Sequence, residues 1–141
     1  MEWMSAAAVF VGGGLGAVLR YYLERFLAPR RTSDALISAV FVINVLGSLA
    51  LGIVGAAVNA LSGQDAVAYA GLSVGLLGGF TTFSTAMVEA VQALLAGRYA
   101  RFVMLWLVQP TLSLIALIAG YTAAAAVLLT VFSARGFAYS R

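Results

Sequence analysis

The chain contains neither cysteine nor histidine, and these two absences exclude several classes of protein. Without cysteine there is no disulfide bond and no thiolate metal site. Without histidine there is no imidazole ligand, and the Ser-His and Cys-His pairs of nucleophilic enzymes cannot form. An enzyme would have to work with five carboxylates and eight basic residues. We therefore expect that the chain is not an enzyme.

Lysine is also absent, and charge of either sign is scarce. All eight basic residues are arginines, and the net charge is only +3. Charged residues make up 9% of the chain, against about 25% in soluble domains. Nucleic-acid binding would need a clustered basic face, and none is present, so we expect no nucleic-acid partner. The remaining charge is too little to cover a surface that faces water.

Apolar residues make up 63% of the chain and gather in long uncharged runs. Four such runs are long enough to cross a bilayer, which takes roughly 20 mostly apolar residues. They are Trp3–Leu19, Ala35–Gln64, Ala66–Val88 and Phe102–Ala134. Glu2 and the lack of a basic leader argue against a cleaved targeting segment. The sequence predicts an all-α, multi-pass protein of the cell membrane, with one four-helix domain over residues 1–141 and the lipid bilayer around it.

Turn and cap residues set the bounds that we expect for the four helices. The predicted ranges are Trp3–Leu27, Asp34–Leu61, Ala66–Ala96 and Arg101–Phe132. Thr32 or Ser33 can cap the second helix, and Asp34 is favoured in its first turn. Pro110 will either kink the fourth helix or lie near its first turns. Glycines four residues apart, such as Gly12 and Gly16, predict close helix packing.

The third helix carries the most informative segment, which reads G-L-L-G-G-F-T-T-F-S-T-A-M-V-E over Gly75–Glu89. A glycine pair and two threonines predict a break near Gly78–Thr82. In lipid, a break leaves carbonyls without helical partners and is tolerated where they face protein, water or an ion. Broken helices supply ion sites in transporters. The alternative is a structural kink with no ion.

Two other helices carry polar groups at membrane depth. Asn44 is the strongly polar group in the first half of the second helix, and such an amide usually faces the bundle interior. It either forms an interhelical hydrogen bond or lines a pore as a donor. Gln109 and Ser113 are four residues apart and share a helical face. This face and the break could form a polar track.

The arginines are unevenly distributed between the two predicted sides of the membrane. One side holds Arg25, Arg30, Arg31, Arg98 and Arg101, and the other holds Arg135 and Arg141. The positive-inside rule places the first group in the cytoplasm and both termini outside. Arg20 lies near the end of the first helix, where it either snorkels to headgroups or attracts anions in a vestibule.

Three segments in this order resemble the Fluc/CrcB family of fluoride channels. They are G-G-L-G-A-V-L-R-Y (Gly13–Tyr21), N-V-L-G-S (Asn44–Ser48) and G-G-F-T-T-F-S-T (Gly78–Thr85). The resemblance implies an antiparallel, dual-topology dimer with two fluoride pores and a central structural sodium ion. It also implies passive export of fluoride from the cytoplasm, which lowers fluoride toxicity. The partner would be a second copy or a homologous chain in inverted orientation.

The same resemblance assigns roles to individual residues. The sodium ligands would be the backbone carbonyls of Gly78 and Thr81, and Glu89 would lie in a vestibule. An aromatic ring has a positive edge that can stabilise a small anion, which is the role implied for Phe83. The expected fluoride pathway comprises Arg20, Asn44, Phe83, Ser84, Thr85, Gln109 and Ser113.

Two positions depart from the family pattern. Ala86 stands where the family has a second phenylalanine, and Gln109 stands where it has a tyrosine. A pore built partly from this chain could therefore be altered or inactive. Together with the uneven arginines, this favours as an alternative a pore-deficient subunit of a heterodimeric fluoride channel.

Two further alternatives come from other classes. A small four-helix, proton-coupled multidrug exporter needs a carboxylate within the membrane, but the first helix has no acid between Trp3 and Leu19, and Glu89 lies past the break. A non-transporting bundle that acts as an assembly partner would explain the small-residue faces. It would not explain Asn44 or the T-T-F-S-T segment.

Overall fold

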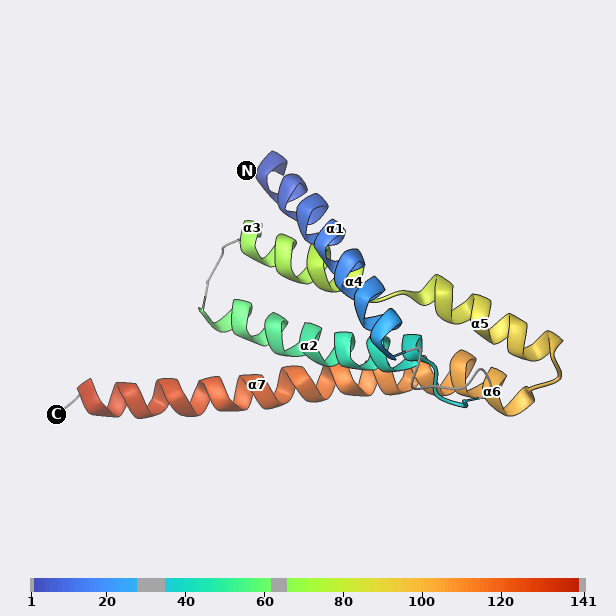
Figure 1. The fold of residues 1–141 in the computed structure, drawn as a ribbon. Helices are drawn as coiled ribbons and strands as arrows, with labels where there is room; N and C mark the ends of the chain where they lie inside the picture. Colours follow the sequence, from blue (N-terminus) through green and yellow to red (C-terminus); the bar gives the residue numbers. More distant parts are fainter. Residues whose placement is uncertain (1, 28–34, 62–65, 140–141) are drawn as a thin grey trace.

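The computed structural model describes residues 2–27, 35–61 and 66–139, and the regular elements in these ranges are all helical (Figure 1). Four helices are long and apolar enough to cross a membrane: Glu2–Leu27, Ala39–Ala60, Ala70–Leu95 and Tyr99–Ser133. The prediction of an all-helical chain with four membrane-capable helices is confirmed.

The first two helices are single α-helices. Helix α1 (Glu2–Leu27) begins one residue before the predicted start. Helix α2 (Ala39–Leu61) begins five residues after the predicted Asp34, so that prediction was wrong. Ser38 is the residue that caps α2, because its Oγ accepts a hydrogen bond of 3.1 Å from the Phe41 amide. The caps predicted from Thr32, Ser33 and Asp34 lie outside the described residues.

The third membrane-capable helix is built from four pieces. They are α3 (Ala66–Tyr69), the π-helical η2 (Ala70–Leu77), α4 (Gly78–Phe80) and α5 (Phe83–Leu95). Between α4 and α5, Thr81 (φ −83°, ψ 153°) and Thr82 (φ −147°, ψ 119°) are extended. The interruption is therefore narrower than the predicted 78–82, since Gly78 still belongs to a helical turn. Figure 1 shows α5 as a separate helix, joined to α4 by a short extended segment.

The fourth helix is longer than predicted at both ends. It consists of α6 (Tyr99–Val103), the π-helical η3 (Met104–Val108) and α7 (Gln109–Tyr139). Pro110 is the second residue of α7, so it lies near the junction with η3. A tight turn joins α5 to α6: Gly97 has φ 71°, and the Arg98 amide donates to the Ala93 carbonyl at 2.8 Å. This is the usual way in which a glycine ends a helix.

Two close helix contacts rest on glycine. On α1, Gly12 faces the Gly71 carbonyl and Gly16 faces the Leu76 carbonyl, both in η2. Between α2 and α7, Gly52 faces the Leu117 carbonyl in the same way. A methyl group at any of these positions would overlap a backbone oxygen of the other helix. The predicted close approach of the glycine-bearing helices is therefore confirmed.

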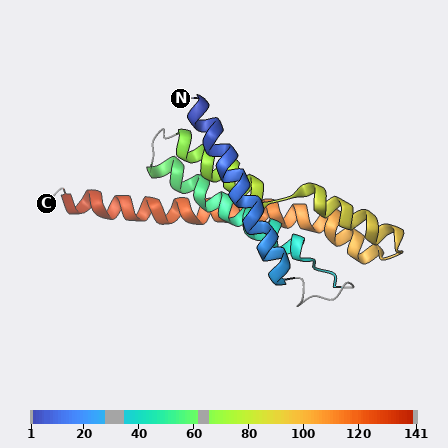
Figure 2. The same cartoon turned by 45° about the horizontal axis from the view of Figure 1, so that its top comes forward.

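The packing places α2 at the centre of the chain. In the apolar windows of the four helices, 39% of α2 is buried, whereas only 6% is buried in α1 and in the fourth helix. Figures 1 and 2 show α7 running alongside α2 and continuing beyond its end. Large apolar side chains, among them Trp3, Phe10 and Leu129, point outward. A single chain thus leaves most of its apolar surface uncovered.

Candidate functional site

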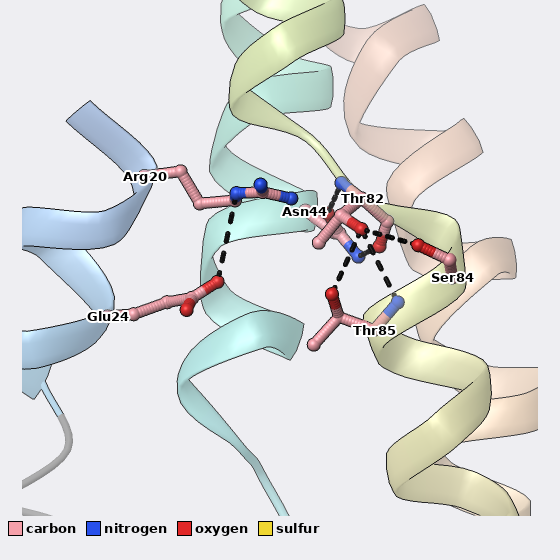
Figure 3. A network of polar contacts seen from close by, with 6 residues as sticks. All are labelled: Arg20, Glu24, Asn44, Thr82, Ser84 and Thr85. Carbon is pink, nitrogen blue, oxygen red and sulfur yellow. Dashed lines mark hydrogen bonds and ion pairs between the residues drawn. The ribbon is translucent and has the colours of Figure 1, made fainter. Parts of the chain in front are cut away.

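The site is organised by Asn44 of α2 and the extended segment that follows α4. The Asn44 Nδ2 donates to the Thr82 carbonyl at 2.7 Å, and the Thr82 amide donates to the Asn44 Oδ1 at 2.8 Å. Both residues are more than nine-tenths buried, with 7% and 8% of their surface exposed. One side-chain amide therefore satisfies both backbone groups of one extended residue, as Figure 3 shows.

The Thr82 hydroxyl joins three further groups at the start of α5. Its Oγ1 lies 3.3 Å from the Ser84 Oγ and 3.2 Å from the Thr85 Oγ1. It also accepts a hydrogen bond of 3.4 Å from the Thr85 amide, which makes Thr82 the N-cap of α5. The two predicted hydroxyl residues, Ser84 and Thr85, are thus tied to the break through Thr82 (Figure 3).

The hydrogen bonds of the Thr82 and Thr85 amides determine which backbone carbonyls at the break lack a helical partner. In a continuous α-helix, the amides of Thr82 and Thr85 would donate to the carbonyls four residues earlier, which belong to Gly78 and Thr81. Here they donate to Asn44 Oδ1 and to Thr82 Oγ1 instead. The two carbonyls that lose these helical partners are the pair that the family resemblance assigned to sodium.

Beside the break lies an open cavity of about 210 Å³. Its lining joins residues of α2, the break, α5 and α7: Asn44, Ser48, Thr81, Thr82, Phe83, Met87, Gln109, Pro110 and Ser113. Four predicted pathway residues therefore share one space. Ser48 and Met87 are additions that our reading of the sequence missed. Helical spacing could have found them, because each lies one turn after a predicted residue, Asn44 and Phe83 respectively.

The α7 side of the cavity carries two buried polar atoms with open hydrogen-bonding capacity. Gln109 is 3% exposed, and its Oε1 has no hydrogen-bond partner among the described residues. The Ser113 Oγ is likewise buried without a partner in the described part of the chain. Buried polar groups are nearly always satisfied in folded proteins. An unpartnered pair on one cavity wall therefore indicates a place for a polar ligand or water.

The two phenylalanine-type positions on α5 lie in opposite environments. Phe83 is 68% exposed and lines the cavity from the first turn of α5. Ala86 is 0% exposed, as one of the three alanines that form the buried side of this helix. The departure at position 86 thus falls in the packed interior of the chain.

The predicted charged residues do not line the cavity. On α1, the Arg20 Nε lies 4.0 Å from the Glu24 Oε1, and both side chains are about one-third exposed or less. Figure 3 shows this pair across from the Asn44–Thr82 contacts. Glu89 of α5 pairs with Arg101 of α6 at 3.5 Å. Arg20 and Glu89 therefore lie outside the cavity lining, and each is paired with a residue of opposite charge.

The sequence matches the family model described as "CrcB-like protein, Camphor Resistance (CrcB)" over residues 7–121. The chain belongs to the CrcB-like family. This span includes α1 from residue 7 onward, α2, the break and the first part of α7, and therefore all the residues of the cavity. The last part of α7 lies beyond the matched residues.

Curated relatives carry a consistent name. The chain is 37% identical to the "Fluoride-specific ion channel FluC" of Methylobacterium sp. (strain 4-46), over 72% of this chain and 80% of that protein. It is 36% identical to the channel of the same name from Methylobacterium nodulans, over 69% and 77%. It is 35% identical to that of Phocaeicola vulgatus, over 70% and 79%.

These matches decide the general class of the protein. The chain is a multi-pass membrane protein of an ion-channel family, and the prediction that it is not an enzyme is confirmed. The proton-coupled multidrug exporter and the non-transporting bundle find no support among these relatives.

Proposed function

We propose that the chain conducts fluoride passively out of the cytoplasm and thereby lowers fluoride toxicity. The observation that carries this proposal is the cavity beside the break. It is lined by amide and hydroxyl groups and one aromatic ring, and the described lining includes no charged side chain. Selective pores choose ions by width and by the hydrogen-bonding groups on their walls. A wall of neutral donors suits a small anion that must replace its water.

Each donor has a hydrogen available for such an ion. The Ser113 hydroxyl can rotate to donate, and the Gln109 amide carries two N–H groups. Asn44 lines the cavity and uses one N–H on the Thr82 carbonyl, so the second N–H is the one that would donate to the ion. The edge of the Phe83 ring, which is electropositive, adds a weaker contact. In this proposal the Ser84 and Thr85 hydroxyls continue the fluoride pathway beyond the break. Arg20 and Glu89 would lie in the vestibules at the ends of the pathway.

The proposal includes a structural sodium ion, and the backbone carbonyls at the break are suitable ligands for it. Sodium sites in transporters use carbonyls from unwound helix segments. The Gly78 and Thr81 carbonyls have lost the helical N–H groups that would otherwise occupy them. These two residues would hold the ion, which would stabilise the junction by neutralising the dipoles of the two carbonyls. Two oxygens from one chain are too few for a cation site, so a second chain would supply the others.

The second chain of the proposal is an inverted copy or a homologous chain. The uncovered apolar surface of α1 and α7 leaves room for it. A homologous chain is favoured only by the sequence, because Ala86 has no aromatic ring where the resemblance implies a second phenylalanine; the complete burial of Ala86 adds no support. In that arrangement this subunit would contribute Asn44, Phe83, Gln109 and Ser113, and its partner would supply the missing ring.

Fluoride efflux from liposomes tests the proposal. Purified chain is reconstituted into vesicles loaded with potassium fluoride or potassium chloride, and release is followed with ion-selective electrodes after valinomycin is added. We expect rapid fluoride release and no chloride release. Fluoride release that begins only when a homologous chain is co-reconstituted would support the heterodimer. Equal release of both anions, or none under either condition, would refute a fluoride channel.

A matched pair of variants connects the efflux to the cavity. Phe83→Ile removes the ring at the cavity wall, whereas Leu95→Ile changes a side chain at the end of the same helix that is 82% exposed. We expect a loss of about fivefold for Phe83→Ile, since a favourable ring contact worth about 1 kcal/mol is lost. The Leu95→Ile chain should behave as the unmodified one.

A further inference from the structure

Asn44 does more at this site than offer a donor to the cavity. We propose that Asn44 is a positioning residue that holds Thr81 and Thr82 extended, and thereby presents the Gly78 and Thr81 carbonyls to a cation. This inference rests on the sodium site of the proposed function. According to this inference, the backbone conformation of that site depends on a side chain of another helix, 38 residues away in sequence.

The contact has the geometry of a backbone pair. Both hydrogen bonds are short, at 2.7 and 2.8 Å, and Asn44 and Thr82 are both buried. A carboxamide suits a carbonyl and an amide of the same residue, because it carries a donor and an acceptor side by side. The torsion angles of Thr82, −147° and 119°, are those of a strand residue paired in this way.

Removal of the Asn44 amide would leave the Thr82 N–H without its acceptor. A buried amide without a partner is costly, so the main chain would move to satisfy it. The nearest acceptor in a helical arrangement is the Gly78 carbonyl, four residues earlier. The same movement would close the break and occupy one of the two oxygens proposed for the cation.

A second feature of α2 supports the same role. Gly47 lies one turn after Asn44, and a Cβ at this position would come within 2.6 Å of the Thr81 Cγ2 and 3.0 Å of the Phe80 ring. Because Gly47 has no side chain, Thr81 can pack directly against α2. One turn of α2 therefore both makes room for the break and hydrogen-bonds to it, which a helix that merely packed beside the break would not do.

Asn44 also lines the cavity with Phe83 and Ser113. The same amide group thus lies between the proposed cation site and the proposed fluoride pathway. Loss of fluoride conduction in an Asn44 variant would not separate the two roles. The test therefore needs readouts of backbone shape and of sodium binding.

The experiment compares Asn44→Ala and Asn44→Asp with Asn59→Ala. Asn59 is the matched control, because it also lies on α2 and contacts another helix through a hydrogen bond of 3.2 Å to the Tyr121 hydroxyl. In sodium-free detergent solution, NMR records the Cα and Cβ shifts of Thr81 and Thr82, which distinguish extended from helical backbone. Thermal unfolding is then followed as Na⁺ replaces K⁺ at constant ionic strength.

We expect the Thr82 shifts of Asn44→Ala to move to helical values and its half-saturating Na⁺ concentration to rise by about fivefold, the effect of one average hydrogen bond. The carboxylate of Asn44→Asp, when ionised, can accept from the Thr82 amide but cannot donate to its carbonyl. This variant should give a smaller shift in the same direction, and it carries the test if Asn44→Ala does not fold. Asn59→Ala should match the unmodified chain in both measurements.

Extended Thr82 shifts in both Asn44 variants, or an unchanged Na⁺ dependence, would overturn the proposal. If the unmodified chain conducts fluoride but its unfolding ignores Na⁺, the sodium site itself fails. The NMR shifts would still decide whether Asn44 holds the break open. Failure of the positioning role and failure of the proposed function are therefore distinguishable.

Discussion

Two regions of this chain bring the backbone of one helix against another, and they do so in different ways. At the α1–η2 contact, Gly16 approaches the Leu76 carbonyl, and the missing side chain alone makes room. At the break, Asn44 approaches Thr82 and replaces a helical hydrogen bond with a side-chain one. The first region uses small residues for packing. The second redirects backbone hydrogen bonds, so that the Gly78 and Thr81 carbonyls lose the helical partners that a continuous helix would give them.

The two regions also differ in how their backbone and buried polar atoms are satisfied. The glycine contacts bury main chain that keeps its own helical partners. The break and the facing α7 wall bury polar atoms that the described part of the chain does not satisfy, the Gln109 Oε1 and the Ser113 Oγ. Substitutions at the glycines should therefore lower the stability of the chain most, and substitutions at the break and the facing α7 wall should slow transport most. The predictions below test this division, from the largest expected effect to the smallest.

Gly16→Ala should destabilise the chain most strongly. Its new methyl group would overlap the Leu76 carbonyl, which belongs to backbone and cannot rotate away. We expect a loss of about 3 kcal/mol, the upper end of the usual cost of overpacking. The measurement is reversible unfolding in mixed detergent. Gly14→Ala is the control, since a Cβ there meets nothing within 4 Å; equal stability of the two variants would contradict the packing role of Gly16.

Ala86→Phe should destabilise the chain without adding a ring to the cavity. Ala86 is completely buried and belongs to the packed type of contact, although it lies on the same helix as Phe83. The larger side chain should cost about 2 kcal/mol. Unfolding measurements would show this, with Ala7→Phe at an exposed position of α1 as the control. A stable Ala86→Phe chain with faster fluoride efflux would show that this position reaches a pore.

Ser113→Ala should slow transport and leave stability almost unchanged. Its hydroxyl has no partner within the described residues, so its removal breaks no hydrogen bond among them. If the hydroxyl donates to fluoride in passage, efflux should fall by about tenfold, the effect of about 1.4 kcal/mol on a barrier. Ser133→Ala, on the same helix but hydrogen-bonded to the Thr130 carbonyl, is the control. Unchanged efflux in Ser113→Ala would remove this residue from the pathway.

Thr82→Val should destabilise the chain less than the two overpacking changes, Gly16→Ala and Ala86→Phe. Valine keeps the shape of the side chain but loses the oxygen that caps the Thr85 amide. Loss of an N-cap of this type costs about 1 kcal/mol. The comparison is with Thr130→Val, where an exposed hydroxyl that bonds the Val127 carbonyl is lost. If the two variants unfold alike, the Thr82 hydroxyl does not organise the start of α5.

The general architecture could be predicted because it depends on local sequence. Long apolar runs give the membrane-capable helices, and glycines at four-residue spacing give the close contacts. The interruption near the threonines followed from the G-G-F-T-T-F-S-T segment. The start of α2 was placed too early, because Thr32 and Ser33 looked like caps and Ser38, which provides the cap, was overlooked.

The details of the site depend on contacts between distant residues, which one sequence does not reveal. Asn44 was expected either to bond another helix or to line a pore; in the structure it bonds the Thr82 backbone and lines the cavity beside the break, and its place in a pore stays a prediction. Nothing in local spacing indicates that its partner is the Thr82 backbone. The burial of Ala86 was equally hidden, since it depends on how α5 turns its alanine side toward the rest of the chain.

The absence of cysteine permits one direct test of whether the cavity at the break is the route for the ion. Ser113→Cys and Ser133→Cys each introduce a single thiol, which is modified with methyl methanethiosulfonate and quantified by mass spectrometry before fluoride efflux is measured. We predict that modification at position 113 blocks efflux, whereas the chain modified at position 133 conducts as before. Complete modification at position 113 with unchanged efflux would contradict the account.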